Sequence, residues 1–179
     1  ACPGAGGGEY AVSEVHYMAP DDVLVLGVDR GEYAQIGPID DLTGIGGVAY
    51  SSFMVDSIED SSHFFREVLG YELRRKMSFR SSGQGMPDTR SGEAIAFLQW
   101  FAPGAITGYL VMMELLDGDK RPYVPIGMAS TGLSMWTFTT DSLASIISRW
   151  QDYSGESAAV LEARVPPFGR VRSIMIASP

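Results

Sequence analysis

Side chains that commonly build reactive centres and metal sites are scarce in this sequence. The 179 residues include one cysteine, Cys2, and two histidines, His16 and His63. A single cysteine cannot form a disulfide within the chain, which fits a reducing, cytoplasmic setting. Cys2 lies in a glycine-rich stretch, residues 1–10, that we expect to be a flexible arm and therefore a poor place for a nucleophile.

Positive charge and long apolar runs are also scarce. The 13 Lys and Arg residues are outnumbered by 22 Asp and Glu residues, which gives a net charge of −9. A basic surface is the usual mark of a nucleic-acid binder, so we expect no nucleic-acid partner. No apolar run approaches the ~20 residues that a helix needs to cross a bilayer, so we expect no membrane partner either. The first residues lack the basic and apolar regions of a signal peptide.

A short helix following residue 57 is the clearest predicted element. Asp56 and Ser57 offer N-cap oxygens, and the acidic first turn suits the positive end of the helix dipole. Gly70 can end the helix in the left-handed conformation. Four apolar side chains share one helical face, Ile58, Phe65, Val68 and Leu69, and Phe64 lies beside it. The Phe64–Phe65 pair therefore predicts a helix that packs on a sheet.

Apolar or alternating runs bounded by turn residues predict strands on both sides of this helix. These runs cover residues 12–18, 23–28, 48–55, 71–79, 94–101, 109–116, 133–140, 158–163 and 171–177, with a second helix over 142–153. After the arm, the predicted units are an N-terminal β-hairpin and linker over 11–46, a complete βαβββ module over 47–117, a linker over 118–131 and a second, incomplete βαβββ module over 132–179.

Two internal matches support this repeat. Aligning Asp56 with Asp141 places YSSFMVDS over MWTFTTDS, two strands that each run into a helix through an Asp-Ser cap. Aligning Pro20 with Pro179 places VSEVHYMAP over VRSIMIASP. The order of these matches is consistent with two copies of one module.

The stretch SFMVDSIEDSSHFFREVLGYEL, residues 52–73, resembles the vicinal oxygen chelate superfamily. This group includes glyoxalase I, extradiol ring-cleavage dioxygenases, fosfomycin and bleomycin resistance proteins and methylmalonyl-CoA epimerase. The resemblance implies an α+β fold in which paired βαβββ modules curl a mixed sheet around a cup, an open cavity for a small organic molecule and often a metal ion. It also implies a homodimer, because family members often build the cup across two chains.

Strand residues that share a face are the candidates for lining such a cup. On the strand at 48–55, Tyr50, Ser52 and Met54 share one face. The repeat aligns Tyr50 with Met135 and Ser52 with Thr137. We therefore expect these five residues to contact the ligand.

Glu114 has the most unusual setting in the predicted sheet. On the strand at 109–116 it shares a face with apolar neighbours, Leu110, Met112 and Leu116. Burying a carboxylate there is costly unless it is paired or liganded. Glu114 is therefore the candidate proton acceptor, with Tyr50 as a hydrogen-bonding acid. We expect Tyr50, Glu114 and Met135 to face one shared cavity.

Aromatic and methionine side chains provide candidate walls for an apolar or aromatic ligand. They are Trp100, Phe101, Met112, Met113, Met135, Trp136 and Phe138. Plain core packing explains any one of them. Together, at aligned strand positions, they favour a planar or aromatic ligand.

The metal that the resemblance implies lacks its usual ligands. Family members use a histidine on each first strand and a glutamate on each fourth strand, and only Glu114 matches. Tyr50 and Met135 occupy the first-strand positions, and neither suits zinc, iron, nickel or manganese. His63 lies on the predicted helix and His16 in the first hairpin. We therefore expect no metal and no other cofactor. The alternative is a divalent metal ion that is bound in part by residues from outside this chain.

The basic run Arg74-Arg75-Lys76 has two interpretations. It can attract an anionic ligand or partner. It can equally be a solvated strand edge, because charged edge strands resist aggregation.

Three functions remain open at this point. The first is a metal-independent enzyme that transforms a small organic molecule, with Glu114 and Tyr50 as its acid–base pair. The second is a protein that sequesters an apolar or aromatic compound without reaction. The third is a metal-dependent lyase, isomerase or extradiol dioxygenase with further ligands from outside this chain.

We predict that the purified protein contains no tightly bound transition metal, because Tyr50 and Met135 stand where histidines are needed. Elemental analysis of protein purified without chelator measures this directly. Near-stoichiometric metal that is lost in Glu114→Ala would contradict it.

We also predict that the strand at 23–28 fills the fourth-strand place of the module over 132–179, within one chain or swapped between two, because open apolar sheet edges are a liability. The competing explanation, that the chain is part of a longer protein, stays open. Deleting residues 1–30 should then lower solubility and the free energy of unfolding. An equally stable and soluble remainder would show that the hairpin is dispensable.

Overall fold

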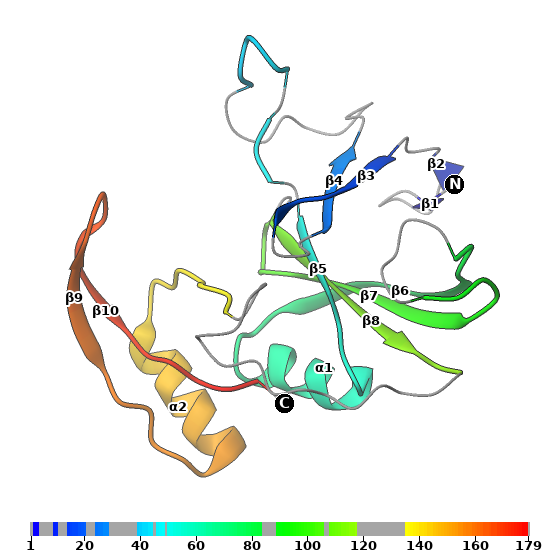
Figure 1. Ribbon diagram of the computed structural model, residues 1–179. Helices are drawn as coiled ribbons and strands as arrows, with labels where there is room; N and C mark the ends of the chain where they lie inside the picture. The colour runs from blue at the N-terminus through cyan, green and yellow to red at the C-terminus, as the bar shows by residue number, and fades with distance from the viewer. Residues whose placement is uncertain are drawn as a thin grey trace.

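A four-stranded mixed sheet forms the centre of the protein (Figure 1). The computed structural model describes residues 2–3, 9–10, 14–20, 24–28, 39–44, 46–48, 50–83, 89–105, 108–117 and 135–178. The sheet order is β5 (Tyr50–Met54), β8 (Tyr109–Leu115), β7 (Ala94–Phe101) and β6 (Glu72–Arg80). β5 is parallel to β8, and the other neighbours are antiparallel.

Helix α1 (Ile58–Glu67) connects β5 to β6, so the predicted order of strand, helix and three strands is confirmed. Ser57, rather than Asp56, is the N-cap residue, and its hydroxyl accepts a hydrogen bond from the Asp60 N–H at 3.2 Å. Past the helix, Gly70 has a φ of 71°, a conformation that side chains with a Cβ rarely adopt. This turn returns the chain to β6.

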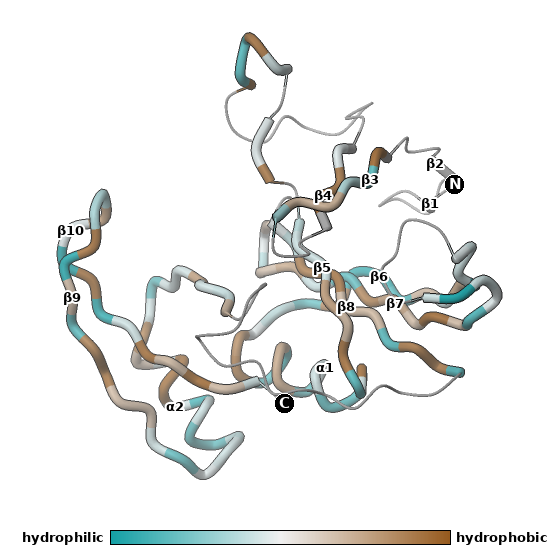
Figure 2. Tube along the Cα trace, viewed as in Figure 1, coloured by the Kyte–Doolittle hydropathy of each residue, from teal (hydrophilic) through white to brown (hydrophobic). Residues whose placement is uncertain are grey.

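The core lies between α1 and one face of the sheet. Phe64 and Phe65 are buried there with Val68, against four side chains of the central strands, Leu98, Trp100, Leu110 and Met112. Figure 2 shows that apolar residues recur along α1 and the strands beside it. The Phe64–Phe65 pair therefore anchors the helix to the sheet, as the sequence predicts.

Helix α2 (Leu143–Ser154) packs beside α1 and closes the same core. The ring of Trp150 meets Phe64 edge-on with centroids 6.3 Å apart, and Tyr153 meets Phe64 at 5.9 Å. Ser142 caps the helix through the Ser145 N–H at 3.3 Å, and Gly155 ends it at a φ of 73°. The second predicted helix is thus confirmed, displaced by one residue.

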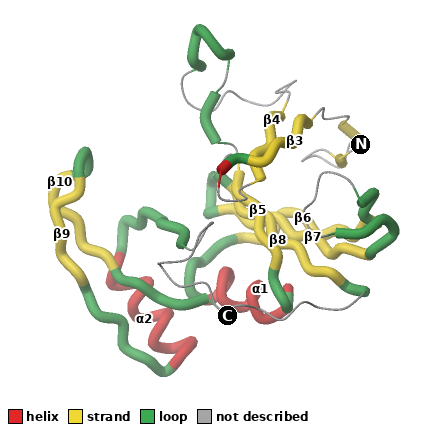
Figure 3. Tube along the Cα trace, in the orientation of Figure 1, coloured by secondary structure: helices red, strands yellow, loops and turns green. Residues whose placement is uncertain are grey.

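The strands predicted around α2 are only partly correct. Residues 135–140 form no strand and run as a loop (Figure 3). Trp136 of this segment packs on Phe53 at 4.6 Å, and Phe138 packs on Tyr71 at 5.9 Å. Contacts of these two rings with the first module take the place of strand pairing, with Trp136 partly buried and Phe138 still exposed.

The chain after α2 forms one antiparallel hairpin, β9 (Leu161–Val165) and β10 (Gly169–Ser173). β9 lies later than the predicted 158–163, and β10 lies earlier than the predicted 171–177. The turn at 166–168 contains Pro166 and Pro167, whose missing N–H groups cannot pair in a ladder. This turn determines where β9 ends and β10 begins.

At the N-terminus, β3 (Glu14–Met18) and β4 (Leu24–Val28) form the predicted hairpin, and β1 (Cys2–Pro3) pairs with β2 (Glu9–Tyr10). In the described part of the chain β4 pairs with β3 alone, and β9–β10 is a separate sheet. The two hairpins lie on different sides of the central sheet (Figure 1). Strand completion within one chain is therefore wrong, while the swapped form stays a prediction.

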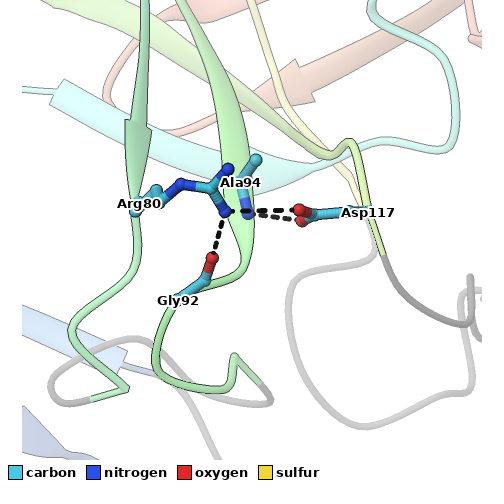
Figure 4. A network of polar contacts seen from close by, with 4 residues as sticks. All are labelled: Arg80, Gly92, Ala94 and Asp117. Carbon is cyan, nitrogen blue, oxygen red and sulfur yellow. Dashed lines mark hydrogen bonds and ion pairs between the residues drawn. The ribbon is translucent and has the colours of Figure 1, made fainter.

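A small polar network ties together the ends of β6, β7 and β8 (Figure 4). The Asp117 carboxylate accepts the Ala94 N–H at 2.5 Å and an Arg80 N–H at 3.4 Å. The Arg80 guanidinium also donates to the Gly92 carbonyl at 2.6 Å. This network joins the end of β6 and the start of β7 to Asp117, just after the end of β8. Neither α1 nor α2 has the length and apolar content that a membrane span requires.

Candidate ligand-binding site

The central sheet has one face covered by helices and one face that neither described helix covers. Three contacts identify the helix-covered face. Phe53 packs on Phe65 at 6.0 Å, Met112 belongs to the core cluster beneath α1, and Glu114 accepts a hydrogen bond from the N–H of Ile58. Because side chains alternate along a strand, the intervening residues point to the other side.

We call that other side the helix-free face. From β5 and β8 it carries Tyr50, Ser52, Met54, Tyr109, Val111 and Met113. From β7 and β6 it carries Ile95, Phe97, Gln99, Phe101, Glu72, Arg75, Met77 and Phe79. The face is mainly apolar and aromatic, with few polar groups, which is the composition of small-molecule sites.

Three aromatic rings stack across this face, one from each of β5, β8 and β7. Tyr50 lies directly opposite Tyr109, with ring centroids 4.9 Å apart and an interplanar angle of 12°. Tyr109 stacks in turn on Phe101 at 4.7 Å and 22°. We call Tyr50, Tyr109 and Phe101 the aromatic ladder. The three rings lie in nearly parallel planes at one end of the sheet, and Phe101 among them is buried.

Arg74 extends the aromatic ladder onto β6. Its guanidinium carbon lies 4.3 Å from the centroid of the Phe101 ring. This is the geometry of a cation–π contact. One end of the helix-free face thus carries aromatic or cationic groups from all four strands.

Glu114 does not lie on the face of Tyr50, so the expected shared cavity of Tyr50, Glu114 and Met135 is not formed. Tyr50 pairs with Tyr109, which gives the odd-numbered residues of β8 the same face as Tyr50. Glu114 therefore points to the helices, where its Oε2 accepts the Ile58 N–H at 2.9 Å. That N–H is one of the donors that a helix N-terminus leaves unpaired, and a carboxylate also suits the positive helix end.

The other predicted ligand contacts separate into three groups. Ser52 and Met54 share the face of Tyr50, as expected. Trp100 and Met112 are core residues under the helices, and Trp136 packs on Phe53. Met135 and Thr137 are exposed on the loop at 135–140. Of the residues predicted to contact a ligand or to wall its site, the structure brings Ser52, Met54, Phe101 and Met113 to the face of Tyr50.

Sequence reasoning missed Tyr109 and the stacking role of Phe101. Tyr109 begins its strand, and its place opposite Tyr50 depends on a register that no local pattern reveals. Arg74 was visible only as part of a basic run with two interpretations. Tyr50 and Tyr109 are the first residues of β5 and β8 in the structure, but the predicted strand at 48–55 begins two residues before Tyr50, so no signal in the sequence pointed to the ladder.

The described side chains do not fit the metal that the resemblance implies. Among them, no three His, Cys, Asp or Glu side chains gather closely enough to hold an ion. The β8 residues that share the face of Tyr50 include Val111 and Met113, which offer no oxygen or nitrogen ligand. His63 lies on α1 against the Tyr153 ring at 5.4 Å. The expectation that no metal binds nevertheless remains a prediction.

A separate depression of about 590 Å³ lies on the β9–β10 hairpin. Its lining residues are Glu162, Ala163, Arg164, Gly169 and Arg170. None of these is a predicted site residue, and all of them except the partly buried Gly169 are exposed. We therefore place the candidate site at the aromatic ladder.

No protein-family model matches the sequence, and no curated protein matches it. Among solved structures, an integron cassette protein from the mobile metagenome of V. cholerae is 17% identical with a TM-score of 0.42, covering 75% of this chain and 88% of that chain. A glyoxylase/bleomycin resistance protein/dioxygenase domain from Frankia sp. EAN1pec is 19% identical with a TM-score of 0.42, covering 68% of this chain and 78% of that chain. The assignment of an α+β fold with a βαβββ module rests on the observed order of the elements and on the mixed sheet.

We predict that Glu114→Ala lowers the free energy of unfolding by about 1–3 kcal/mol, because a partly buried N–H at the start of α1 loses a charged acceptor. Glu114→Gln should lose less, since its amide oxygen can still accept. Urea denaturation measures both.

Glu67→Ala is the matched control for this prediction, because Glu67 is an exposed glutamate that pairs with the neighbouring Arg66. Its stability should stay close to that of the parent protein. Equal stability of Glu114→Ala and the parent would contradict the helix-capping role.

Proposed function

We propose that the protein binds a small organic molecule with a flat aromatic or conjugated part on the helix-free face, at the aromatic ladder. The observation that carries this proposal is the stacking of Tyr50, Tyr109 and Phe101 in nearly parallel planes. Arg74 covers the outer side of the Phe101 ring, so a flat ligand would add its ring at the Tyr50 end of the stack. Aromatic pairs of this kind contribute about 0.5–1.5 kcal/mol beyond the area they bury.

Neighbouring side chains support an apolar, adaptable site. Met54 is 44% exposed on the same face, and Met77 and Met113 are half-buried there. Methionine side chains adjust to ligands of different shape and contact aromatic rings favourably through sulfur. Ser52 and the two tyrosine hydroxyls are polar groups that can orient a ligand by hydrogen bonding.

The position of Glu114 favours binding over acid–base catalysis. Its carboxylate accepts the Ile58 N–H on the opposite face of the sheet from the ladder. A general base must come within hydrogen-bond reach of the proton it removes. Sequestration of the ligand without reaction is therefore the better supported role. A metal-dependent reaction with ligands from outside this chain remains the alternative.

The test is calorimetric titration with 2-naphthalenemethanol, a neutral probe with a flat ring system. We expect measurable binding that weakens about two- to tenfold in Tyr109→Leu, since one stacked pair is lost. Phe101→Leu should act in the same direction.

Phe168→Leu is the matched control, because Phe168 is an aromatic residue 72% exposed at the β9–β10 turn. It should bind the probe as the parent protein does. Thermal melting of each variant confirms that the sheet is intact. Equal affinity in Tyr109→Leu and the parent, or no binding by the parent, would overturn the proposal.

A further inference from the structure

We propose that the β9–β10 hairpin carries a second binding site, in which Arg164 and Arg170 together bind a phosphate monoester. This site is independent of the aromatic ladder, because none of its residues belongs to the central sheet. The hairpin extends away from that sheet (Figure 1), and in the described structure its two strands pair only with each other. Both arginines are exposed there.

The pairing register collects arginines on one face of the hairpin. Arg164 lies directly opposite Arg170, and Glu162 lies directly opposite Arg172. Because side chains alternate along each strand, these four residues share a face, and the residues between them point to the other face. Three of the four are arginines, although acids outnumber bases 22 to 13 in the whole chain. The face is therefore a local basic patch on an acidic protein.

The acid on this face is engaged with a different arginine. Glu162 forms an ion pair with Arg172 at 3.7 Å, and both side chains are more than half exposed. No carboxylate of the described residues forms an ion pair with Arg164 or Arg170. Like charges directly opposite each other on paired strands, with Cβ atoms about 4.5–5.5 Å apart, destabilise the pair. An anion that contacts both guanidinium groups would remove this repulsion.

The depression on the hairpin provides room for such an anion. Its volume is about 590 Å³, and its lining includes both Arg164 and Arg170. Gly169 also lines it, and a Cβ atom added to this glycine would meet no atom within 4 Å apart from its chain neighbours. A small phosphate ester therefore fits beside the two arginines without displacing either strand.

The charge and the number of donors favour a phosphate monoester over a carboxylate. Each guanidinium can present a fork of two N–H groups to an anion. Two forks match a dianion with three terminal oxygens, which is the form of a phosphate monoester above its second pKa of about 6. A carboxylate has one charge and two oxygens, which a single arginine fork already satisfies. Arg164 and Arg170 together therefore select for the dianion.

A solvated hairpin face is the competing explanation, because charged side chains on unpaired strand edges resist aggregation. In that case Arg164 and Arg170 attract phosphate monoesters and carboxylates alike, and the loss of either charge acts as it would anywhere on the surface. The two explanations differ in selectivity for the dianion and in the dependence of binding on these two arginines.

The experiment compares glycerol 3-phosphate with D-glycerate, a hydroxylated acid of similar size with one charge. Binding is measured by NMR titration of the full chain at low ionic strength and about pH 8, with the arginine side-chain signals as the readout. We expect the parent protein to bind glycerol 3-phosphate about tenfold more tightly than D-glycerate. Arg164→Gln and Arg170→Gln should each weaken the binding of glycerol 3-phosphate about three- to tenfold, and the double variant should abolish the preference.

Arg66→Gln is the matched control, because it removes one exposed arginine from α1 and changes the net charge by the same amount. It should leave both affinities unchanged. Glu162→Gln should instead tighten the binding of glycerol 3-phosphate, because it removes the negative charge that lines the depression. Thermal melting of each variant confirms that the protein is folded.

A phosphate monoester can belong to a soluble compound or to a lipid headgroup. Cosedimentation with vesicles of phosphatidylcholine and phosphatidic acid separates these two sources. Binding of glycerol 3-phosphate supports a soluble ester, and binding to the vesicles alone supports a lipid headgroup, provided that the double variant loses the binding. The proposal is overturned by no binding in either assay, by measurable but equal affinity for the two soluble probes, or by a loss in Arg66→Gln as large as that in Arg164→Gln.

Discussion

The pairing of β5 with β8 is the constraint on which the site depends. Parallel pairing with Tyr50 opposite Tyr109 decides which side chains of both strands face the helices. A shift by one residue would place Met112 and Glu114 beside Tyr50 and expose the core to solvent. The core residues Phe53, Leu110 and Met112 therefore hold the aromatic ladder in place from the opposite side of the sheet.

Much of the local structure could be predicted from the sequence. The helix after Ser57 has both a capping residue and a periodic apolar face, and β7 occupies the predicted range. Alternation within each strand was also correct, since Tyr50 shares a face with Ser52 and Met54, and Glu114 shares a face with Met112. The pairing register between neighbouring strands was not predicted correctly, because register depends on contacts between residues that are distant in sequence. Glu114 was consequently assigned to the wrong face.

The region after the linker shows a second limit of local patterns. Residues 135–140 alternate as a strand does, yet Trp136 and Phe138 find partners in Phe53 and Tyr71 of the first module. Apolar contact with an existing core then outweighs backbone pairing with strands that lie farther away. Strand propensity mainly reflects how well a side chain fits a half-buried, pleated surface. A loop that packs the same side chains against a core can therefore replace the strand.

The burial of Trp150 has a consequence for how the chain folds. Trp150 and Ile176 contribute to the core of the first module, and the β9–β10 hairpin contacts no third strand in the described structure. The C-terminal unit therefore has no separate core that could form in advance of the sheet. Since α1 and its sheet join residues close in sequence, they can assemble first and offer α2 a surface on which to dock. The two units should then melt as one cooperative body, although the sequence presents them as repeats.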